Sequence, residues 1–186
     1  MNHSVQVKKV GRENSIHIAV TPATVDERPI LRQLMELYQY DFTEFDGADI
    51  GPTGLYDYPY LDHYWVEDGR EPYLVRVNGQ LAGFVLISRY NYFSGEKDTW
   101  VISEFFILRK YRRQGVGEQV ARWIFDHHPG TWQVSELSEN PGAVTFWRKV
   151  IERYTQNKYE EYNLDDHRWH GPVQAFAALS PDSVKD

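Results

Sequence analysis

The amino-acid sequence predicts a single α/β domain, in which one mixed sheet is flanked by helices. Three observations predict it: a strong hairpin signal near the middle of the chain, a strand–helix–strand pattern directly after it, and a length of 186 residues without internal repeats. A chain of this length suits one domain with a substantial core. Residues 16–179 are expected to form the domain. Residues 1–15 are an extension whose alternating valines could add a strand, and residues 180–186 are a polar tail.

The first third of the chain carries one strand pattern and one helix pattern. Residues 16–22 favour a strand, and Thr24 is placed to cap the helix that follows. The helix pattern comes from apolar residues at helical spacing: Ile30, Leu31, Leu34, Leu37 and Tyr38. Residues 41–54 are acidic and contain glycine, which favours a loop. Residues 56–66 hold five aromatics among carboxylates and are interpreted as a short helix.

The rest of the chain alternates strands and helices. Residues 73–77 and 81–88 predict a hairpin, because the Asn-Gly dipeptide at 78–79 tolerates positive φ at both turn positions. Further strands are predicted over residues 99–108, 131–137, 158–162 and 173–179, and helices over residues 116–128 and from Asn140-Pro141 onward. A strand–helix–strand crossover normally makes its two strands parallel, so residues 99–108 and 131–137 are expected to run parallel.

Composition excludes several classes of protein. The absence of cysteine rules out a disulfide framework, a thiolate zinc site and a cysteine nucleophile. A net charge of −7 disfavours nucleic-acid binding and weakly favours a cationic partner, although solubility is the simpler explanation. No apolar run approaches the ~20 residues of a membrane span, and no secretion signal is recognised, so a cytoplasmic protein is expected. His127-His128 and His167/His170 lack a completing carboxylate, so no metal is expected.

A basic, glycine-containing segment between a predicted strand and helix is the main candidate for a binding site. It consists of Arg109, Lys110, Tyr111, Arg112, Arg113, Gln114, Gly115, Val116 and Gly117. Glycines let a ligand approach the backbone, and a helix N-terminus offers unpaired N–H groups, so the segment suits a diphosphate. A basic loop that merely caps the helix is the alternative. A dinucleotide-binding loop needs a third glycine, and a P-loop needs Gly-Lys-Ser/Thr; neither is present.

This segment resembles the acetyl-CoA motif of the GNAT acetyltransferase superfamily, Arg/Gln-x-x-Gly-x-Gly/Ala after a strand. Arg112, Gly115 and Gly117 match that motif, and the run from Asn140 to Trp147 is similar to the family's Asn-x-x-Ala-x-x-hydrophobic-Tyr segment. The resemblance implies a mostly antiparallel sheet splayed at the cofactor strand, acetyl-CoA as co-substrate, and acetyl transfer to a primary amine. Residues 104–117 also resemble a bacterial subgroup of acetyltransferases.

The resemblance implies roles for individual residues. Backbone groups of Ile107 and Arg109 would bind the pantetheine arm. Asn140 would contact the same arm, and Phe146 would pack near the cofactor; a plain helix cap and an ordinary core position are the alternatives. Backbone amides would bind the pyrophosphate at Gln114, Gly115, Val116, Gly117 and Glu118. Arg112 would lie by the phosphates or pack on its own loop.

Two residues are candidates for the proton transfers. Glu104 lies in an otherwise apolar strand, where desolvation would raise its pKa and suit it to deprotonate an ammonium; a paired structural carboxylate is the alternative. Where Trp147 stands, the family often has a Tyr that protonates the leaving thiolate, and an indole is no useful acid. Tyr154, two helical turns further on, is the candidate donor.

The acceptor is expected to be a small-molecule amine that attacks directly in a ternary complex, because no cysteine is available for a covalent intermediate. Carboxylates and tyrosines that would suit a cationic amine gather before the hairpin: Asp41, Glu44, Asp46, Asp57, Asp62, Tyr56, Tyr58, Tyr60 and Tyr64. A solvated acidic loop is the alternative. A protein amino group as acceptor, a non-catalytic acetyl-CoA sensor, and the choice between monomer and homodimer stay open.

Overall fold

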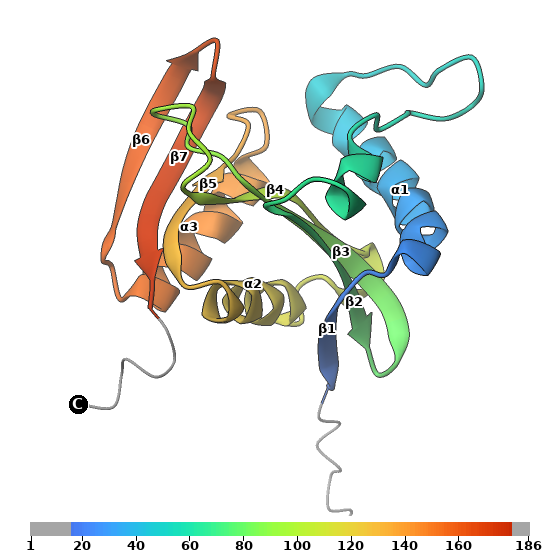
Figure 1. The fold of residues 1–186 in the computed structure, drawn as a ribbon, viewed down its shortest axis with the longest axis horizontal. Helices are drawn as coiled ribbons and strands as arrows, with labels where there is room; N and C mark the ends of the chain where they lie inside the picture. Colours follow the sequence, from blue (N-terminus) through green and yellow to red (C-terminus); the bar gives the residue numbers. More distant parts are fainter. Residues whose placement is uncertain (1–15, 180–186) are drawn as a thin grey trace, which may run out of the picture.

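A computed structural model describes residues 16–179. Seven strands form one open sheet in the order β1-β2-β3-β4-β5-β7-β6 (Figure 1). Neighbouring strands are antiparallel except for β4 and β5, which are parallel, as the crossover predicts. The expected mixed, mostly antiparallel sheet is confirmed. The valines of the predicted extra strand lie outside the described residues.

The strands are β1 (Ile18–Pro22), β2 (Arg70–Val77), β3 (Gln80–Arg89), β4 (Trp100–Ile107), β5 (Gly130–Ser135), β6 (Tyr159–Asp166) and β7 (Trp169–Ala178). The helices are α1 (Arg28–Asp46), α2 (Val116–His127) and α3 (Pro141–Thr155), with 3-10 turns η1 (Val25–Glu27), η2 (Leu61–Trp65) and η3 (Arg109–Tyr111). The β2–β3 turn has positive φ at both Asn78 and Gly79, which confirms the predicted hairpin. None of the helices within residues 16–179 is long and apolar enough to cross a membrane.

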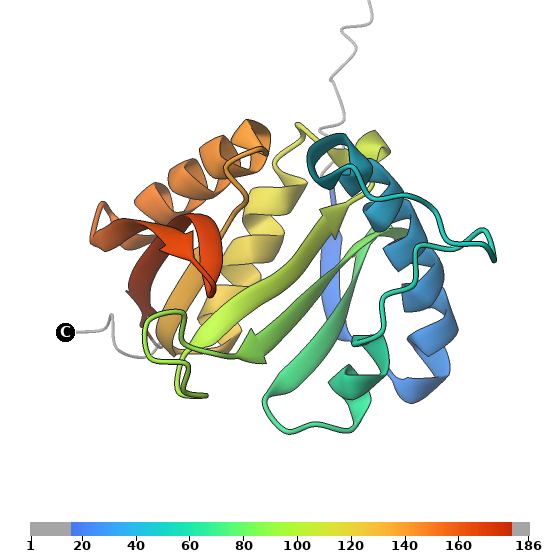
Figure 2. The same cartoon turned by 90° about the horizontal axis from the view of Figure 1, so that it is seen from above.

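Helices cover both faces of the sheet (Figure 2). On one face, α1 and η2 bury Leu31, Leu61 and Leu74 in a smaller core. On the other face, α2 and α3 cover a larger core that contains Trp132 and Ile151. One face of β4 therefore packs against the smaller core under α1, and the other against the larger core under α2 and α3. The surroundings of each β4 side chain depend on the face to which it points.

Helix α1 is longer than the sequence pattern predicts. The predicted loop over residues 41–54 is wrong for residues 41–46, which continue the helix to Gly47. Aromatic side chains on successive turns keep this part packed, with Phe42 5.4 Å from Tyr38 and 5.7 Å from Phe45 between ring centroids. Gly47 ends the helix in the left-handed conformation, and its amide donates to the Thr43 carbonyl. The acidic residues that suggested a loop belong to a helix end.

The parallel pair of β4 and β5 is short. Its register contains two pairs, Trp100 with Trp132 and Val101 with Gln133. Beyond Val101 the two strands separate, so the later part of β4 has a strand neighbour on the β3 side alone. The sheet therefore opens at β4, the strand at which the family resemblance implies a splay.

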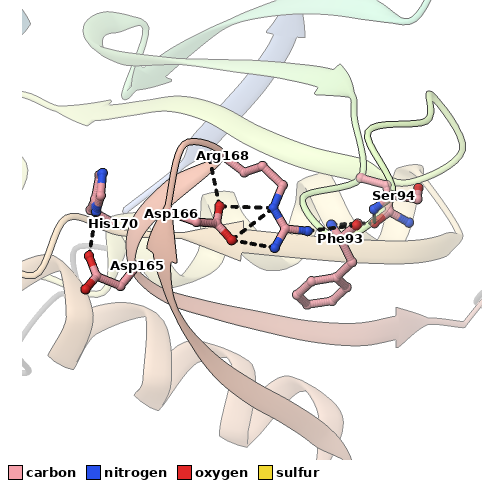
Figure 3. A network of polar contacts seen from close by, with 7 residues as sticks. Phe93, Ser94, Asp165, Asp166, Arg168 and His170 are labelled. Carbon is pink, nitrogen blue, oxygen red and sulfur yellow. Dashed lines mark hydrogen bonds and ion pairs between the residues drawn. The ribbon is translucent and has the colours of Figure 1, made fainter.

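A polar network ties the β6–β7 turn to the β3–β4 loop (Figure 3). The Arg168 guanidinium pairs with the Asp166 carboxylate at 2.5 Å and donates to the Phe93 carbonyl oxygen at 2.8 Å. The Phe93 ring also packs on Tyr162, with centroids 4.8 Å apart. These contacts fix two loops at one end of the opened sheet.

Candidate active site

Helix α2 begins with backbone amides that no side chain caps. Gly115 precedes the helix with φ 76°, and the first backbone hydrogen bond of the helix runs from the Gln119 amide to the Gly115 carbonyl. The amides of the first turn, at Val116, Gly117 and Glu118, come before that bond. Such a helix start binds anions through its N–H groups and its positive dipole end. The loop therefore fits a diphosphate by its backbone.

Gly117 lies where α2 meets two aromatic side chains. A Cβ atom at this position would come within 3.2 Å of the Phe146 ring and 3.7 Å of the Phe105 ring. Phe105 and Phe146 are 5.8 Å apart between centroids, and each lies 5.0 Å from Trp147. The structure thus brings Phe146 of the second motif against Gly117 of the first.

Two polar side chains of this segment, Gln114 and Glu118, bind protein groups. Gln114 donates to the Lys110 carbonyl at 2.7 Å, and Glu118 pairs with Arg153 of α3 at 2.7 Å. These contacts hold the loop and join α2 to α3. Gln114 and Glu118 therefore hold the loop in place and leave its backbone amides to meet an anion.

Arg112 adopts the second of its two expected positions and packs on its own loop. Its Nε donates to the Ile107 carbonyl oxygen at 2.6 Å, and its Nη2 pairs with Asp41 of α1 at 2.5 Å. The guanidinium also lies 5.5 Å from the centre of the Phe106 ring. The side chain thus clamps the end of β4 to α1.

The backbone of Ile107 faces the opening of the sheet. The next amide, at Leu108, donates to Ala82 of β3 at 2.8 Å. Successive backbone groups in a strand point to opposite sides, so those of Ile107 point away from β3. The Ile107 carbonyl accepts from Arg112, and the Arg109 carbonyl accepts from the Arg112 amide at 3.2 Å. A ligand in the opening would therefore meet the N–H group of Ile107.

Asn140 caps α3, as the sequence predicts. Its Oδ1 accepts from the Ala143 amide at 2.9 Å. Within residues 16–179 no protein group accepts from the Asn140 side-chain nitrogen, so its two N–H donors are available to a ligand. The cap and a contact with a pantetheine arm are therefore compatible.

A β-bulge turns Glu104 toward α1. Leu86 pairs with Glu104, but the next residue of β3, Ile87, pairs with Ile102, so Ser103 is an extra residue in β4. On either side of the bulge, Ile102 and Phe105 face the larger core under α2 and α3. Ser103 and Glu104 therefore share the opposite face, where the Ser103 hydroxyl bonds the Ser88 hydroxyl at 2.8 Å.

Glu104 has the environment of a base that works near neutral pH. Its side chain keeps partial contact with solvent, yet desolvation by the surrounding protein raises its pKa to about 7. The nearby hydroxyls of Tyr38 and Tyr58 act in the opposite direction because they stabilise the carboxylate. Burial raises the pKa of both tyrosines, so they stay protonated donors.

Further tyrosines surround this carboxylate. Burial, and to a smaller extent the charge of Glu104, raises the pKa of Tyr64 and of Tyr92. The Tyr92 hydroxyl is held by Ser135 of β5 at 2.9 Å. Glu104 thus lies among phenol groups from α1, from the segment before β2 and from the β3–β4 loop.

The structure does not bring Tyr154 together with Glu104. The Tyr154 hydroxyl donates to Asp126 of α2 at 2.9 Å, and its ring packs on Phe125 and Phe176 in the larger core. Burial and the Asp126 carboxylate raise its pKa. Trp147, at the position where the family often has Tyr, is buried against Phe105 and Phe146.

Two of the five acidic residues predicted for the acceptor region form ion pairs with arginines. Asp41 pairs with Arg109 and Arg112, and Asp62 pairs with Arg32 at 2.9 Å. Of the tyrosines in that group, Tyr58 and Tyr64 lie near Glu104.

Sequence analysis missed the role of Tyr38 and the presence of a second perturbed carboxylate. Tyr38 was assigned to the helix core; its hydroxyl on an apolar stripe is the signal that could have marked it. Burial raises the pKa of Glu136 to about 8, and Gln174 donates to it at 3.2 Å. Gln174 also donates to Glu161, which Arg148 of α3 binds at 2.6 Å. No sequence pattern marks Glu136.

The opened sheet and the uncapped helix start beside it define the class of acyltransferases that bind coenzyme A. Residues 31–151 match the model of the acetyltransferase (GNAT) family, which is more than half of the chain. The chain therefore belongs to the GNAT family and is an acetyl-CoA-dependent acetyltransferase. No curated protein matches the sequence.

Solved structures share the fold at low sequence identity. An acetyltransferase from Thermus thermophilus is 14% identical, with a TM-score of 0.64 over 86% of this chain and 96% of that one. A spermidine N-acetyltransferase from Vibrio cholerae, in complex with CoA and spermine, is 10% identical, with a TM-score of 0.58 over 87% and 95%. The ribosomal-protein-S18-alanine N-acetyltransferase from Escherichia coli is 11% identical, with a TM-score of 0.55 over 88% and 95%.

Proposed function

We propose that this acetyltransferase acetylates a primary amine of a small molecule, by direct attack of the amine in a ternary complex. The observation that carries the proposal is Glu104, a carboxylate with a pKa of about 7 at the place where β4 and β5 separate. An amine is protonated at neutral pH and has no lone pair for attack until it loses a proton. A carboxylate with a pKa of about 7 can take up this proton near neutral pH.

The cofactor is proposed to bind along the end of β4 and the start of α2. The amides of Gln114, Gly115, Val116, Gly117 and Glu118 would bind its pyrophosphate, which fits the uncapped helix start. The amides of Ile107 and Arg109 and the side chain of Asn140 would bind the pantetheine arm. Phe146 would pack beside it. When bound, acetyl-CoA supplies the thioester that the amine attacks.

Glu104 would accept the proton of the acceptor ammonium, directly or through a water molecule. Tyr38 and Tyr58 support this role because their hydroxyls hold the carboxylate in place and favour its ionised form. The Ile107 amide faces the opening and would donate to the oxygen on which charge develops. Base and oxyanion donor would thus come from one strand, three residues apart.

The proton donor for the leaving thiolate stays a prediction. Tyr154 is the residue that the sequence suggests, but its hydroxyl is bonded to Asp126 of α2 and its ring packs in the larger core, which gives that role little support. Trp147 carries an indole N–H that can donate a hydrogen bond but not a proton. Protonation of the thiolate by solvent is compatible with both observations.

A small cationic amine is the favoured acceptor because phenol rings and a carboxylate meet at Glu104. The solved relatives include enzymes named for spermidine, for an aminoglycoside and for a ribosomal protein, so the fold itself admits both classes of acceptor. The favoured class for this chain rests on the aromatic surroundings of Glu104 alone.

Release of the CoA thiol in the presence of an amine panel tests the proposal. The panel contains spermidine, an aminoglycoside, lysine and a peptide with a free α-amino group. We expect rapid release with at least one small amine, and loss of that release in Glu104→Gln. Release with the peptide alone would instead identify a protein acetyltransferase. Binding of acetyl-CoA without release by any amine would identify a non-catalytic sensor.

A further inference from the structure

Asp41, near the end of α1, binds two of the three arginines of the loop that follows β4, Arg109 and Arg112. Its Oδ1 accepts from Arg109 Nη2 at 2.6 Å, and its Oδ2 accepts from Arg112 Nη2 at 2.5 Å. The Asp41 side chain is 18% exposed, whereas that of Arg109 is 72% exposed. Burial alone would raise the pKa of Asp41, but the two guanidinium groups overcome this and hold the pKa below its usual value. An ionised carboxylate of α1 is therefore seated on the cofactor loop.

The same part of α1 also reaches the base. Tyr38 lies about one helical turn before Asp41, and its hydroxyl approaches the Glu104 carboxylate. The Tyr38 ring packs on Phe106, with centroids 5.6 Å apart. Figure 2 shows α1 running beside the end of β4. One short stretch of helix thus contacts the cofactor loop through Asp41 and the proposed base through Tyr38.

We propose that Asp41 is a positioning residue that couples the cofactor loop to the acceptor side of the site. The inference rests on the proposed function, because it requires CoA to bind the start of α2. A bound pyrophosphate orders the loop and, with it, Arg109 and Arg112. The ordering of these two arginines lowers the entropic cost of holding Asp41, and therefore α1 and Tyr38, in place. Bound cofactor then prepares the surroundings of Glu104 for the acceptor.

A second set of contacts, through the Phe106 ring, also connects the cofactor loop to Tyr38. The role of Asp41 can be tested by separating its ion pairs from these contacts. The Arg112 guanidinium lies over the Phe106 ring, and Phe106 contacts Tyr38. Replacement of Asp41 by Asn keeps these ring contacts and the size of the side chain, and removes the charge that binds both arginines. If packing alone linked the two sides, this variant would keep the coupling.

Hydrogen–deuterium exchange on the full chain, with CoA as the probe, measures the coupling without an acceptor. The quantity is the ratio of exchange rates without and with CoA for the amides of residues 38–46. We expect CoA to slow this exchange about fivefold in the natural sequence, which is the lower end of typical coupling between sites. In Asp41→Asn the ratio should fall to about one, while CoA still protects the amides of residues 116–119.

Asp62→Asn is the matched control. Asp62 lies in η2 and pairs with Arg32 near the start of α1, so this variant also removes an ion pair to α1, but at the opposite end of the helix from Asp41. It should keep the fivefold ratio. A merely structural Asp41 would speed exchange in α1 equally with and without CoA and leave the ratio unchanged, which would overturn the inference. Protection of residues 116–119 without any response of α1 in the natural sequence would also overturn it. Failure of CoA to protect residues 116–119 would instead remove the proposed cofactor site, and the inference with it.

Discussion

The two sides of the opened sheet offer a ligand different kinds of groups. On the cofactor side, the groups are backbone amides at the start of α2 and the end of β4, and side chains such as Gln114 and Glu118 serve to hold the backbone. On the acceptor side, the groups are side chains around Glu104, supplied by α1 and by the segment before β2. Backbone suits a ligand whose shape is constant, whereas side chains can change with the acceptor.

A change on the acceptor side should alter kcat and its pH dependence and leave the affinity for acetyl-CoA unchanged. Glu104→Gln tests this with the largest expected effect. With the best amine of the panel, kcat should fall by roughly 100-fold to 1,000-fold, which lies within the range for loss of a general base. In the natural enzyme kcat should rise as pH passes about 7, where Glu104 loses its proton, and this rise should vanish in the variant.

Glu136→Gln is the control for this experiment. Glu136 is also buried, with its pKa raised to about 8, but it lies beside Gln174 on the sheet face that α3 covers. Its replacement should leave the inflection near pH 7 in place. If the inflection survives in Glu104→Gln and disappears in Glu136→Gln, Glu136 is the base and Glu104 is not.

The cofactor side should respond in the opposite manner. Gly117→Leu places a side chain against the Phe146 ring and over the first amides of α2. The affinity for acetyl-CoA, measured by calorimetry, should fall by about 100-fold, which corresponds to about 2.7 kcal/mol. Gln119→Leu, on the exposed side of the same helix, should bind normally. Equal affinities in the two variants would contradict the assignment of the loop.

Tyr38→Phe should change the pH dependence of the acceptor side with a smaller effect than Glu104→Gln. The lost hydroxyl no longer stabilises the Glu104 carboxylate, so the pKa of Glu104 should rise and the inflection of the kcat profile should move to higher pH. Activity at pH 7 should fall while activity at pH 9 is kept. Tyr40→Phe, on the same helix and 63% exposed, should leave the profile where it is.

The smallest effect is expected for Tyr154→Phe. This variant removes one partly exposed hydrogen bond to Asp126, so stability should fall by about 1 kcal/mol or less and kcat should stay within about twofold. Thermal unfolding and steady-state kinetics measure the two quantities. A tenfold fall in kcat without loss of stability would establish Tyr154 as the proton donor after all.

The sequence predicted what is encoded locally. The turn at Asn78-Gly79, the cap at Asn140 and the glycines at the start of α2 depend on neighbours a few residues away, and the structure contains all three. The extent of α1 was missed because its last turns are stabilised by packing between aromatic rings and by Gly47.

The acceptor side could be predicted only in part, because it depends on pairing and on distant contacts. Glu104 stood out as a carboxylate in an apolar strand, but the face on which it lies follows from the extra residue at Ser103, and no local pattern reveals that bulge. Asp41 binds arginines 68 and 71 positions away. Contacts of this length arise from topology, so the tyrosines and carboxylates were predicted as a group without their partners.

The short register between β4 and β5 has a mechanical consequence. Two residue pairs join the four-stranded half of the sheet, β1 to β4, to the three-stranded half, β5 to β7. In the part of the chain that the structure describes, the two halves are thus hydrogen-bonded to each other only where β4 begins, and they diverge from that point. A pantetheine arm bonded along the end of β4 would lie between the two diverging halves and keep them separated. The cofactor would then act both as reagent and as a structural part of the sheet.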